Sequence, residues 1–332
     1  MATAVPPSRY TQDEVLALCG YRDKRRRQFF SESQIHHRYL YLPPDFYPDE
    51  TIDALNARFE RASLDIGSLA IERCLTAAGL QPTDIDFVAT TTCTGRLCPS
   101  LDTRFIRAFK MRSDIQRVHV GDTGCASALV AIQQAVNHVH AFPGHRALVA
   151  AVEVCSATYF LDEALDTAVA NAIFSDGAGA LVITDTLEGL EILGSQTLLR
   201  SEYLDYMGFT YPGGRPRILL SKEIRHLAAE MLQEMVGRLL HSHGLRQEHI
   251  RFWVLHSAGR RVLERAQELL GLHDDDLAPA RTILKNYGNI SSATVLFVLE
   301  ETLRSGHPAR GDLGVMAALG PGFAAEGVLL RC

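Results

Sequence analysis

The sequence predicts an α/β fold built from two copies of one unit, and pairs of similar segments carry that prediction. "GLQPTDIDFVATTTCTG" begins at Gly79 and "GLRQEHIRFWVLHSAGR" begins at Gly244, an offset of 165 residues. The same offset relates "GCASALVAIQQAV" from Gly124 to "NISSATVLFVLEETL" from Asn289. A third pair, "FSDGAGALVIT" and "GVMAALGPGFAAEGVLLR", follows in the same order. Self-similarity this regular favours duplication of an α/β unit over chance.

Each pair predicts particular elements. In the first pair, a helix ends at glycine, a polar turn follows, and a run of apolar and β-branched residues is typical of a strand. The second pair predicts the start of a long apolar helix, with small residues in its first turn. The third pair predicts, in each half, two strands hinged at glycine.

These matches divide the chain into three parts. Residues 1–184 form the first half and residues 223–332 the second, while residues 185–222 connect them. The connecting segment contains "YLDYMGFTYPGGRPR", which is rich in aromatic residues, Gly and Pro. Because long connections in compact proteins are often functional, we expect an inserted loop or hairpin that walls a substrate site.

Composition argues against several classes of protein. The chain has 332 residues, 47% of them hydrophobic, enough for a large buried core. A net charge of −6 disfavours general binding to nucleic acid or to an anionic membrane. No stretch reads as a signal peptide or as a membrane-spanning helix. Seven scattered cysteines without metal-ligand spacing predict free thiols in the cytoplasm, with no metal or cofactor.

Cys125 is the first candidate for catalysis. The stretch "VHVGDTGCASALVAIQQAV" places it between a β-branched strand and a long apolar helix. A thiol in the first turn of a helix faces the positive end of the helix dipole, which favours the thiolate. Gly121 and Gly124 permit the sharp turn that presents a nucleophile. An isolated cysteine there could equally be a small buried apolar residue.

The duplication adds His256 and Asn289 to Cys125. Asn289 begins the repeat-equivalent helix, and His256 ends the repeat-equivalent strand. Since ligands bind at the carboxyl ends of strands in open α/β sheets, we expect the three residues to share one site. Alone, His256 would be interpreted as a structural histidine and Asn289 as a helix N-cap. The three residues together indicate a catalytic site more strongly than any one of them does alone.

Several motifs resemble those of the thiolase-fold condensing enzymes: "GDTGC", "LHSAGRR", "NYGNISSATVLFVLEE", "FSDGAGALVI" and "ALGPGFAAEGVLL". "YGNISSATVLFVLEE" and "SQIHHRYLYLP" are similar to the type III polyketide synthases of the chalcone synthase family. "CSATYFLDEALDTAVANAIFSDGAGAL" resembles the bacterial branch that makes dihydroxyphenylacetyl-CoA. The likeness runs from about Cys19 to the C-terminus. It implies a duplicated thiolase fold of five layers, αβαβα, and a homodimer.

The resemblance also implies a reaction. It is a β-ketoacyl synthase-like Claisen condensation through an acyl-cysteine thioester, in bacterial polyketide or secondary-metabolite biosynthesis. Cys125 would accept the acyl group, and His256 with Asn289 would assist decarboxylation of a malonyl extender. Loss of CO₂ leaves negative charge on the thioester oxygen, which two neutral N–H donors can stabilise. The backbone N–H groups of Cys125 and Gly322 match the family's oxyanion hole.

The sequence leaves two candidates for the acyl donor: a CoA thioester and a thioester of an acyl-carrier protein. Arg25 matches one of the family's CoA-binding bases, but Gln28 and Glu32 stand where further bases are expected. Arg261 matches a position that type III ketoacyl synthases use toward the carrier protein, and Arg260 precedes it. Arginine clusters suit either anionic donor. The close group of CoA-binding bases is depleted at Gln28 and Glu32, whereas the arginines spread over a wider surface, such as Arg260 and Arg261, are present. We therefore expect carrier-protein thioesters to serve at least as well as CoA thioesters.

Three further residues have other interpretations. Cys98, in "TTCTGRLCPSLD", matches a family loop that reaches across the dimer and walls the partner's pocket. Cys93 in the same loop is interpreted as a packing residue. Asp176, in "SDGAG", is expected to support a turn.

Other functions stay open on sequence alone. One is a stand-alone ketosynthase that joins two carrier-bound acyl chains, a β-ketoacyl extender among them, without decarboxylation, as in pyrone formation. Another is an acyltransferase that passes the acyl group to an alcohol or amine. A third is an inactive structural partner subunit, which the presence of Cys125, His256 and Asn289 disfavours.

Overall fold

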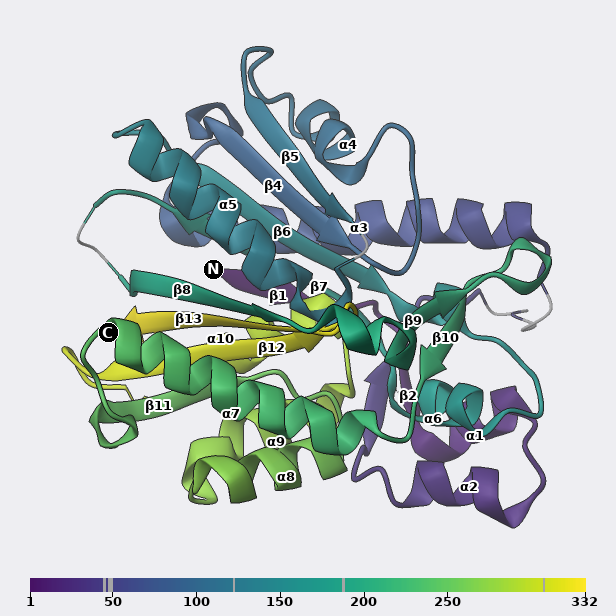
Figure 1. Cartoon of the computed structure of the whole chain (residues 1–332). Helices are drawn as coiled ribbons and strands as arrows, with labels where there is room; N and C mark the ends of the chain where they lie inside the picture. The colour runs from purple at the N-terminus through teal and green to yellow at the C-terminus, as the bar shows by residue number, and fades with distance from the viewer. Residues whose placement is uncertain (44–45, 47–49, 122, 187–188, 307) are drawn as a thin grey trace.

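The computed structural model contains two large β-sheets, of five and four strands, with helices between and outside them (Figure 1). It describes residues 1–43, 46, 50–121, 123–186, 189–306 and 308–332. Asp122 of "GDTGC" and residues 187–188 of the connecting segment lie outside the described residues.

The two sheets repeat one strand order. The first runs β1-β7-β6-β4-β5 and the second runs β8-β13-β12-β11, with a parallel pair at the β4 and β11 positions. The strands of the first sheet are β1 (Ala2–Ala4), β4 (Phe87–Thr92), β5 (Gln116–Gly121), β6 (Ala147–Val154) and β7 (Asp176–Ile183). Those of the second are β8 (Glu191–Leu199), β11 (Ile250–Leu255), β12 (Leu313–Gly320) and β13 (Ala324–Arg331).

Helices complete five layers. α5 (Ser127–Ala141) and α10 (Thr294–Arg304) lie between the sheets, with α9 (Ala278–Tyr287) packed beside α10. α3 (Ile52–Ala78) and α4 (Leu101–Ala108) cover the first sheet, and α7 (Ile224–Ser242) and α8 (Arg260–Leu270) cover the second (Figure 1). The predicted αβαβα layering is confirmed.

The composition of the central helices explains their position. A helix that is apolar on all sides must be buried on all sides. In α10, Val295, Leu296, Val298 and Leu299 are all buried, although they point in different directions around the helix. In α5, small side chains such as Ala131 are fully buried and let both sheets approach closely.

The predicted helix, turn and strand form in both halves. α3 ends at Gly79, whose φ of +66° closes the helix, and a 3-10 turn (Pro82–Asp84) leads into β4. In the second half, Gly244 with φ of +65° follows α7, and a 3-10 turn (Gln247–His249) leads into β11. Glycine is suited to both places because its left-handed conformation carries no Cβ penalty.

The third pair of segments differs from the prediction. "GVMAALGPGFAAEGVLLR" forms the hairpin of β12 and β13, but "FSDGAGALVIT" forms the single strand β7, which pairs with β6. The glycines of this strand do not form a hinge. They leave space for residues of the central layer to pack closely against β7. A Cβ on Gly179 would lie 2.8 Å from Leu296 of α10, and one on Gly177 would lie 3.0 Å from Ile290. Among the residues that the structure describes, the second sheet also has no strand equivalent to β5.

The connecting segment contributes to both a sheet and a cap. β8 forms the edge of the second sheet, and β9 (Met207–Thr210) and β10 (Arg217–Leu220) form a hairpin, with 3-10 turns (Ser201–Tyr206 and Pro212–Gly214). This hairpin gathers with short elements from the first half at one end of the molecule (Figure 1). We call this group the cap: α1 (Gln12–Cys19), α2 (Lys24–Ser31), β2 (Arg9–Thr11), β3 (His37–Tyr39), α6 (Leu165–Ile173), β9 and β10.

Candidate active site

Cys125, His256 and Asn289 line one cavity of about 640 Å³. Cys125 lies in a 3-10 turn (Gly124–Ala126) directly before α5, and His256 directly follows β11. Asn289 precedes the equivalent 3-10 turn (Ser291–Ala293) before α10. The two halves of the fold thus bring the three predicted residues together from distant parts of the chain.

The thiol of Cys125 lies in the cavity wall and is half-buried. Its Sγ lies 3.4 Å from the hydroxyl of Ser291. Burial raises the pKa of the Cys125 thiol to about 12, and the Ser291 hydrogen bond works against that rise. The sequence predicts a thiolate stabilised by the helix dipole, but burial favours the neutral thiol. Removal of the charged form from water is the largest effect on the pKa of this thiol.

His256 is a neutral imidazole in this cavity. Its side chain is 6% exposed, and among the described residues neither ring nitrogen has a hydrogen-bond partner. Burial lowers the pKa of His256 to about 4. A neutral ring keeps one N–H donor and one acceptor nitrogen near neutral pH.

Asn289 holds the turn before the central helix α10 and also faces the cavity. Its Oδ1 accepts the N–H of Ser291 at 2.8 Å and the hydroxyl of Thr294 at 3.3 Å. Its Nδ2 donates to the carbonyl of Ala258 at 3.1 Å, which leaves the second amide hydrogen for a ligand. The backbone N–H of Asn289 donates to the carbonyl of Ile173 in α6. Asn289 is therefore not the N-cap of α10, a position that Ala293 occupies, and its side chain orders the turn that precedes this helix.

Glycines bring the Gly322 loop against the Cys125 turn. Gly124 has a φ of +57°, and a Cβ there would lie 2.2 Å from Pro321 Cδ. A Cβ on Gly320 would lie 2.5 Å from the carbonyl oxygen of Thr123. Gly322 itself has a φ of +130°, which L side chains rarely adopt. The backbones of Cys125 and Gly322, predicted to form the oxyanion hole, thus lie in two turns packed on each other.

Basic residues line the same cavity. Arg25, Arg260 and Arg261, the predicted donor-binding residues, all belong to its wall. Lys222 joins them, and sequence reasoning missed it because it stands outside any motif, directly after β10. Arg260 pairs with Glu264 at 3.1 Å, so part of its charge is already compensated.

Apolar side chains from the cap form a further part of the wall. They are only half-buried because they face the cavity, and they come from α2, α6, β9 and β10. Sequence reasoning anticipated a wall from residues 185–222 but not the part played by α2 and α6. These side chains are Phe29, Leu165, Val169, Ile173, Met207 and Leu220.

The two cysteines of the "TTCTGRLCPSLD" loop differ in environment. Cys98 is exposed and does not line the cavity of its own chain. Cys93 has polar partners, since its Sγ lies 3.0 Å from the Ser291 hydroxyl and its N–H donates to Glu153 at 3.1 Å. Sequence reasoning missed Ser291 and Glu153. The one available signal for Glu153 is a single charged residue within the apolar strand "ALVAAVEV".

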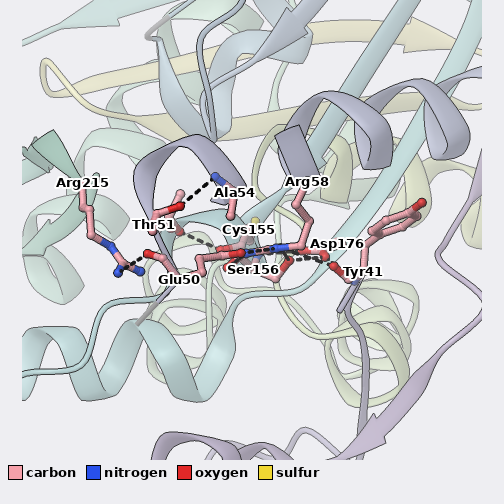
Figure 2. A network of polar contacts seen from close by, with 10 residues as sticks. Tyr41, Glu50, Thr51, Ala54, Arg58, Cys155, Ser156, Asp176 and Arg215 are labelled. Carbon is pink, nitrogen blue, oxygen red and sulfur yellow. Dashed lines mark hydrogen bonds and ion pairs between the residues drawn. The ribbon is translucent and has the colours of Figure 1, made fainter. Parts of the chain in front are cut away.

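Asp176 anchors the turn after β6. It accepts hydrogen bonds from the N–H of Tyr41, the N–H of Ser156 and the Ser156 hydroxyl, each at 2.7 Å. Arg58 donates to the Ser156 hydroxyl at 2.8 Å and pairs with Glu50 (Figure 2). The role of Asp176 is therefore structural, in agreement with the turn-supporting interpretation.

The described part of the chain contains neither a cluster of metal ligands nor a membrane-spanning helix. Within these residues, no three His, Cys, Asp or Glu side chains are placed to hold a metal ion. No helix in the same part of the chain is long and apolar enough to cross a membrane.

Comparisons with known proteins assign the family. Residues 215–332 match the family "Chalcone and stilbene synthases, C-terminal domain", and residues 34–191 match "FAE1/Type III polyketide synthase-like protein". Over 340 residues the chain is 31% identical to a 3,5-dihydroxyphenylacetyl-CoA synthase of Amycolatopsis balhimycina, covering 100% of this chain and 91% of that protein. The chain belongs to the type III polyketide synthases.

Further relatives agree with this family. The polyketide synthase is 32% identical to a 1,3,6,8-tetrahydroxynaphthalene synthase of Streptomyces peucetius, over 99% of this chain and 91% of that one. The crystal structure of the Streptomyces coelicolor 1,3,6,8-tetrahydroxynaphthalene synthase superimposes with a TM-score of 0.92 at 26% identity, covering 99% and 97% of the two chains. The resemblance, the thiolase-like fold and the class of bacterial acyl-transferring condensing enzyme are confirmed.

Proposed function

We propose that this type III polyketide synthase forms C–C bonds by decarboxylative Claisen condensation, with the growing chain held as a thioester on Cys125. The observation that carries the proposal is the single cavity lined by Cys125, His256 and Asn289. A nucleophile and two neutral donors at one apolar site match the needs of acyl transfer and of enolate formation.

Acyl transfer to Cys125 comes first in this scheme. The Cys125 sulfur attacks the thioester carbonyl of the donor, and the carbonyl oxygen becomes an oxyanion. The backbone N–H groups of Cys125 and Gly322 donate to it, because fixed dipoles in a water-poor site stabilise developing charge without reorganisation. The leaving thiolate of the donor departs, and the acyl group remains on Cys125.

Decarboxylation of the extender comes second. Loss of CO₂ from a malonyl thioester leaves an enolate whose oxygen needs hydrogen-bond donors. Neutral His256 supplies one N–H, and the second amide hydrogen of Asn289 supplies another. The enolate carbon then attacks the acyl-Cys125 carbonyl, a C–C bond forms, and the Cys125 sulfur leaves.

Acyl-CoA is the first candidate for the donor. The Amycolatopsis relative is named for a CoA ester, and Arg25, Arg260, Arg261 and Lys222 supply cations on the cavity wall. A carrier protein is the second candidate. A neighbouring hollow shares Arg260 and Arg261 with the cavity and extends to Arg265, although Glu264 and Glu268 in the same hollow pair with Arg260 and Arg265 and leave Arg261 as its main basic contact for a protein partner.

The proposed assembly is a homodimer in the cytoplasm. β5, the strand directly before Cys125, is the edge of the first sheet, and an edge strand offers unpaired backbone groups to a second copy. Such pairing would leave Cys98 free to reach the partner's cavity. All seven cysteines are free thiols, which agrees with a reducing compartment. Sedimentation equilibrium tests the dimer, and a monomer at micromolar concentration contradicts it.

Intact-protein mass after incubation with acyl-CoA and malonyl-CoA tests the scheme. Wild-type protein should gain one acyl group, and Cys125→Ala should gain none while keeping its far-UV circular dichroism. Asn289→Ala should still be acylated but lose about 10²-fold or more in CO₂ release, the scale of one lost oxyanion donor. Acylation of Cys125→Ala at another cysteine refutes the nucleophile. Condensation without any CO₂ release favours the non-decarboxylative ketosynthase.

A further inference from the structure

Arg38, in β3, is a buried cation that the condensation scheme does not use. Its side chain is 0% exposed. Its Nη1 lies 2.8 Å from the hydroxyl of Tyr159, 2.6 Å from the carbonyl oxygen of Asn171 and 3.0 Å from that of Phe174. Its Nε and Nη2 have no hydrogen-bond partner among the described residues. Because burial of a cation costs free energy, the neutral oxygens around Nη1 must compensate its charge.

The C-terminal end of α6 supplies most of this compensation. Asn171 lies in the last turn of α6 and Phe174 is its C-cap, where the carbonyl groups form the negative end of the helix dipole. The guanidinium also lies 5.8 Å from the centre of the Phe30 ring. The Tyr159 hydroxyl donates to the Phe174 carbonyl at 3.0 Å, so that two donors hold the same oxygen. Arg38 therefore fixes the point at which α6 ends.

Asn289 is bound to the residues on either side of Phe174. Its backbone N–H donates to the carbonyl of Ile173 at 2.9 Å, and its carbonyl accepts the N–H of Ser175 at 2.8 Å. Phe174 and Asn289 form an isolated parallel bridge. Arg38 thus holds the middle of a three-residue segment, 173–175, whose two ends hold the backbone of Asn289.

β3 contacts the same region at two further points. The stem of Arg38 packs on Gly288, the residue before Asn289, since a Cβ on Gly288 would lie 3.1 Å from Arg38 Cγ. Tyr39, the residue after Arg38, exchanges two hydrogen bonds with the Ser175 hydroxyl, each of 2.9 Å. The guanidinium contact is therefore one part of a close packing between β3, the end of α6 and the turn that carries Asn289.

We infer that Arg38 is a positioning residue that sets Asn289 for enolate formation. Arg38 itself is fully buried and lies outside the cavity wall. It acts through segment 173–175, which fixes the backbone from which the Asn289 amide faces the cavity. A donor stabilises developing charge best when its position is set before the reaction, because no reorganisation is then needed. The inference rests on the proposed role of Asn289 in decarboxylation.

Cys125 is held by other contacts, which gives the inference a specific signature. The hydroxyl of Ser127 donates to the carbonyl of Gly124 at 2.7 Å, and Gly124 packs on Pro321. Loss of Arg38 should therefore slow decarboxylation, which needs Asn289, more than acyl loading, which needs Cys125. A general folding defect would slow both steps together.

Two substitutions of Arg38 test this signature. Arg38→Met keeps a long apolar stem without charge or donors, and Arg38→Lys keeps a cation that can donate to the end of α6. The two readouts are CO₂ release from malonyl-CoA and the single-turnover loading of Cys125 by an acyl-CoA, measured by intact mass. Arg58→Met is the matched control, because Arg58 is also buried, at 7% exposure, but donates to Ser156 and not to segment 173–175.

The variants should separate as follows. Arg38→Met should release CO₂ about tenfold more slowly than wild type, a part of the roughly 10²–10³-fold that a wholly lost donor costs. Its loading of Cys125 should stay within about threefold of wild type, and Arg38→Lys should recover most of the CO₂ release. Arg58→Met should change both rates to the same extent.

A double variant shows whether Arg38 acts through Asn289. Two residues that act through one group have non-additive effects. Arg38→Met combined with Asn289→Ala should therefore release CO₂ at the rate of Asn289→Ala alone, because the donor that Arg38 positions is already absent. A further loss of about tenfold in the double variant would show that Arg38 acts elsewhere, and would overturn the inference.

Other results would also overturn it. CO₂ release at the wild-type rate in Arg38→Met would do so, and so would an equal loss of loading and release. If Arg38→Met loses the wild-type circular dichroism, Tyr159→Phe decides, because it removes one of the two donors to Phe174 and should slow CO₂ release alone. CO₂ release at the wild-type rate in Asn289→Ala contradicts the proposed function instead, so the two failures are distinguishable.

Discussion

The contact between Gly124 and Pro321 gives a prediction whose size follows from the geometry. In Gly124→Ala the new residue must adopt a φ of +57°, which costs about 1–2 kcal/mol for a residue with a Cβ. The Cβ would also lie 2.2 Å from Pro321 Cδ, well inside the ~3.5–4.0 Å of an ordinary carbon contact. Either the Cys125 turn or the Pro321 loop must therefore move by about 1 Å or more. A displacement of about 1 Å at a reacting group can lower a rate by about 10²-fold.

Gly79→Ala is the matched control for this change. Gly79 has a similar φ of +66°, and a Cβ there would meet nothing within 4 Å. Both variants should lose a few degrees in Tm from backbone strain. Only Gly124→Ala should also lose acyl loading of Cys125, by about 10²-fold in a single-turnover assay read by intact mass. Loading at the wild-type rate in Gly124→Ala would show that the two turns do not set the position of the nucleophile.

Three further predictions follow from the described side chains. Burial lowers the pKa of folded His256 to about 4 against an ordinary 6.5, so the unfolded chain binds an extra proton between these values. Stability should therefore fall as pH falls from about 6.5 to about 4, and urea titrations should show a shallower fall for His256→Gln; equal slopes contradict the burial argument. Arg261→Glu should slow a carrier-protein donor more than a CoA donor in parallel kcat/KM measurements, and equal or larger loss with CoA removes the carrier protein as a candidate. Val169→Trp should fill part of the cavity and shorten the products seen by mass spectrometry, while Cys125 loading stays normal; unchanged products would place Val169 outside the space that the growing chain occupies.

The duplicated fold and its catalytic candidates were predictable because they depend on local patterns. Glycine at a helix end, apolar runs and the 165-residue offset are visible in the letters, and they located Cys125 and Asn289 at equivalent helix starts. The glycines of "SDGAG" were misinterpreted as a hinge. Only the packing of Leu296 on Gly179 shows that they provide space.

The remainder of the site depends on long-range contacts that no local pattern reveals. Glu153 and Cys93 are 60 residues apart, and Ser291 is 198 residues from Cys93. The pKa of the Cys125 thiol depends chiefly on burial, which the sequence around Cys125 does not reveal. The wall built by Val169 likewise appears only once α6 has packed beside α2.

The separation between the layered core and the cap bears on how such an enzyme can diverge. The three candidate catalytic residues stand at the ends of core elements that pack on both sides, where hydrogen exchange should be slowest. Much of the cavity wall comes from the short elements of the cap, which bury fewer residues. Substitutions in the cap can therefore accumulate with little penalty to the core. Such substitutions can change the product while the three candidate catalytic residues of the core are retained.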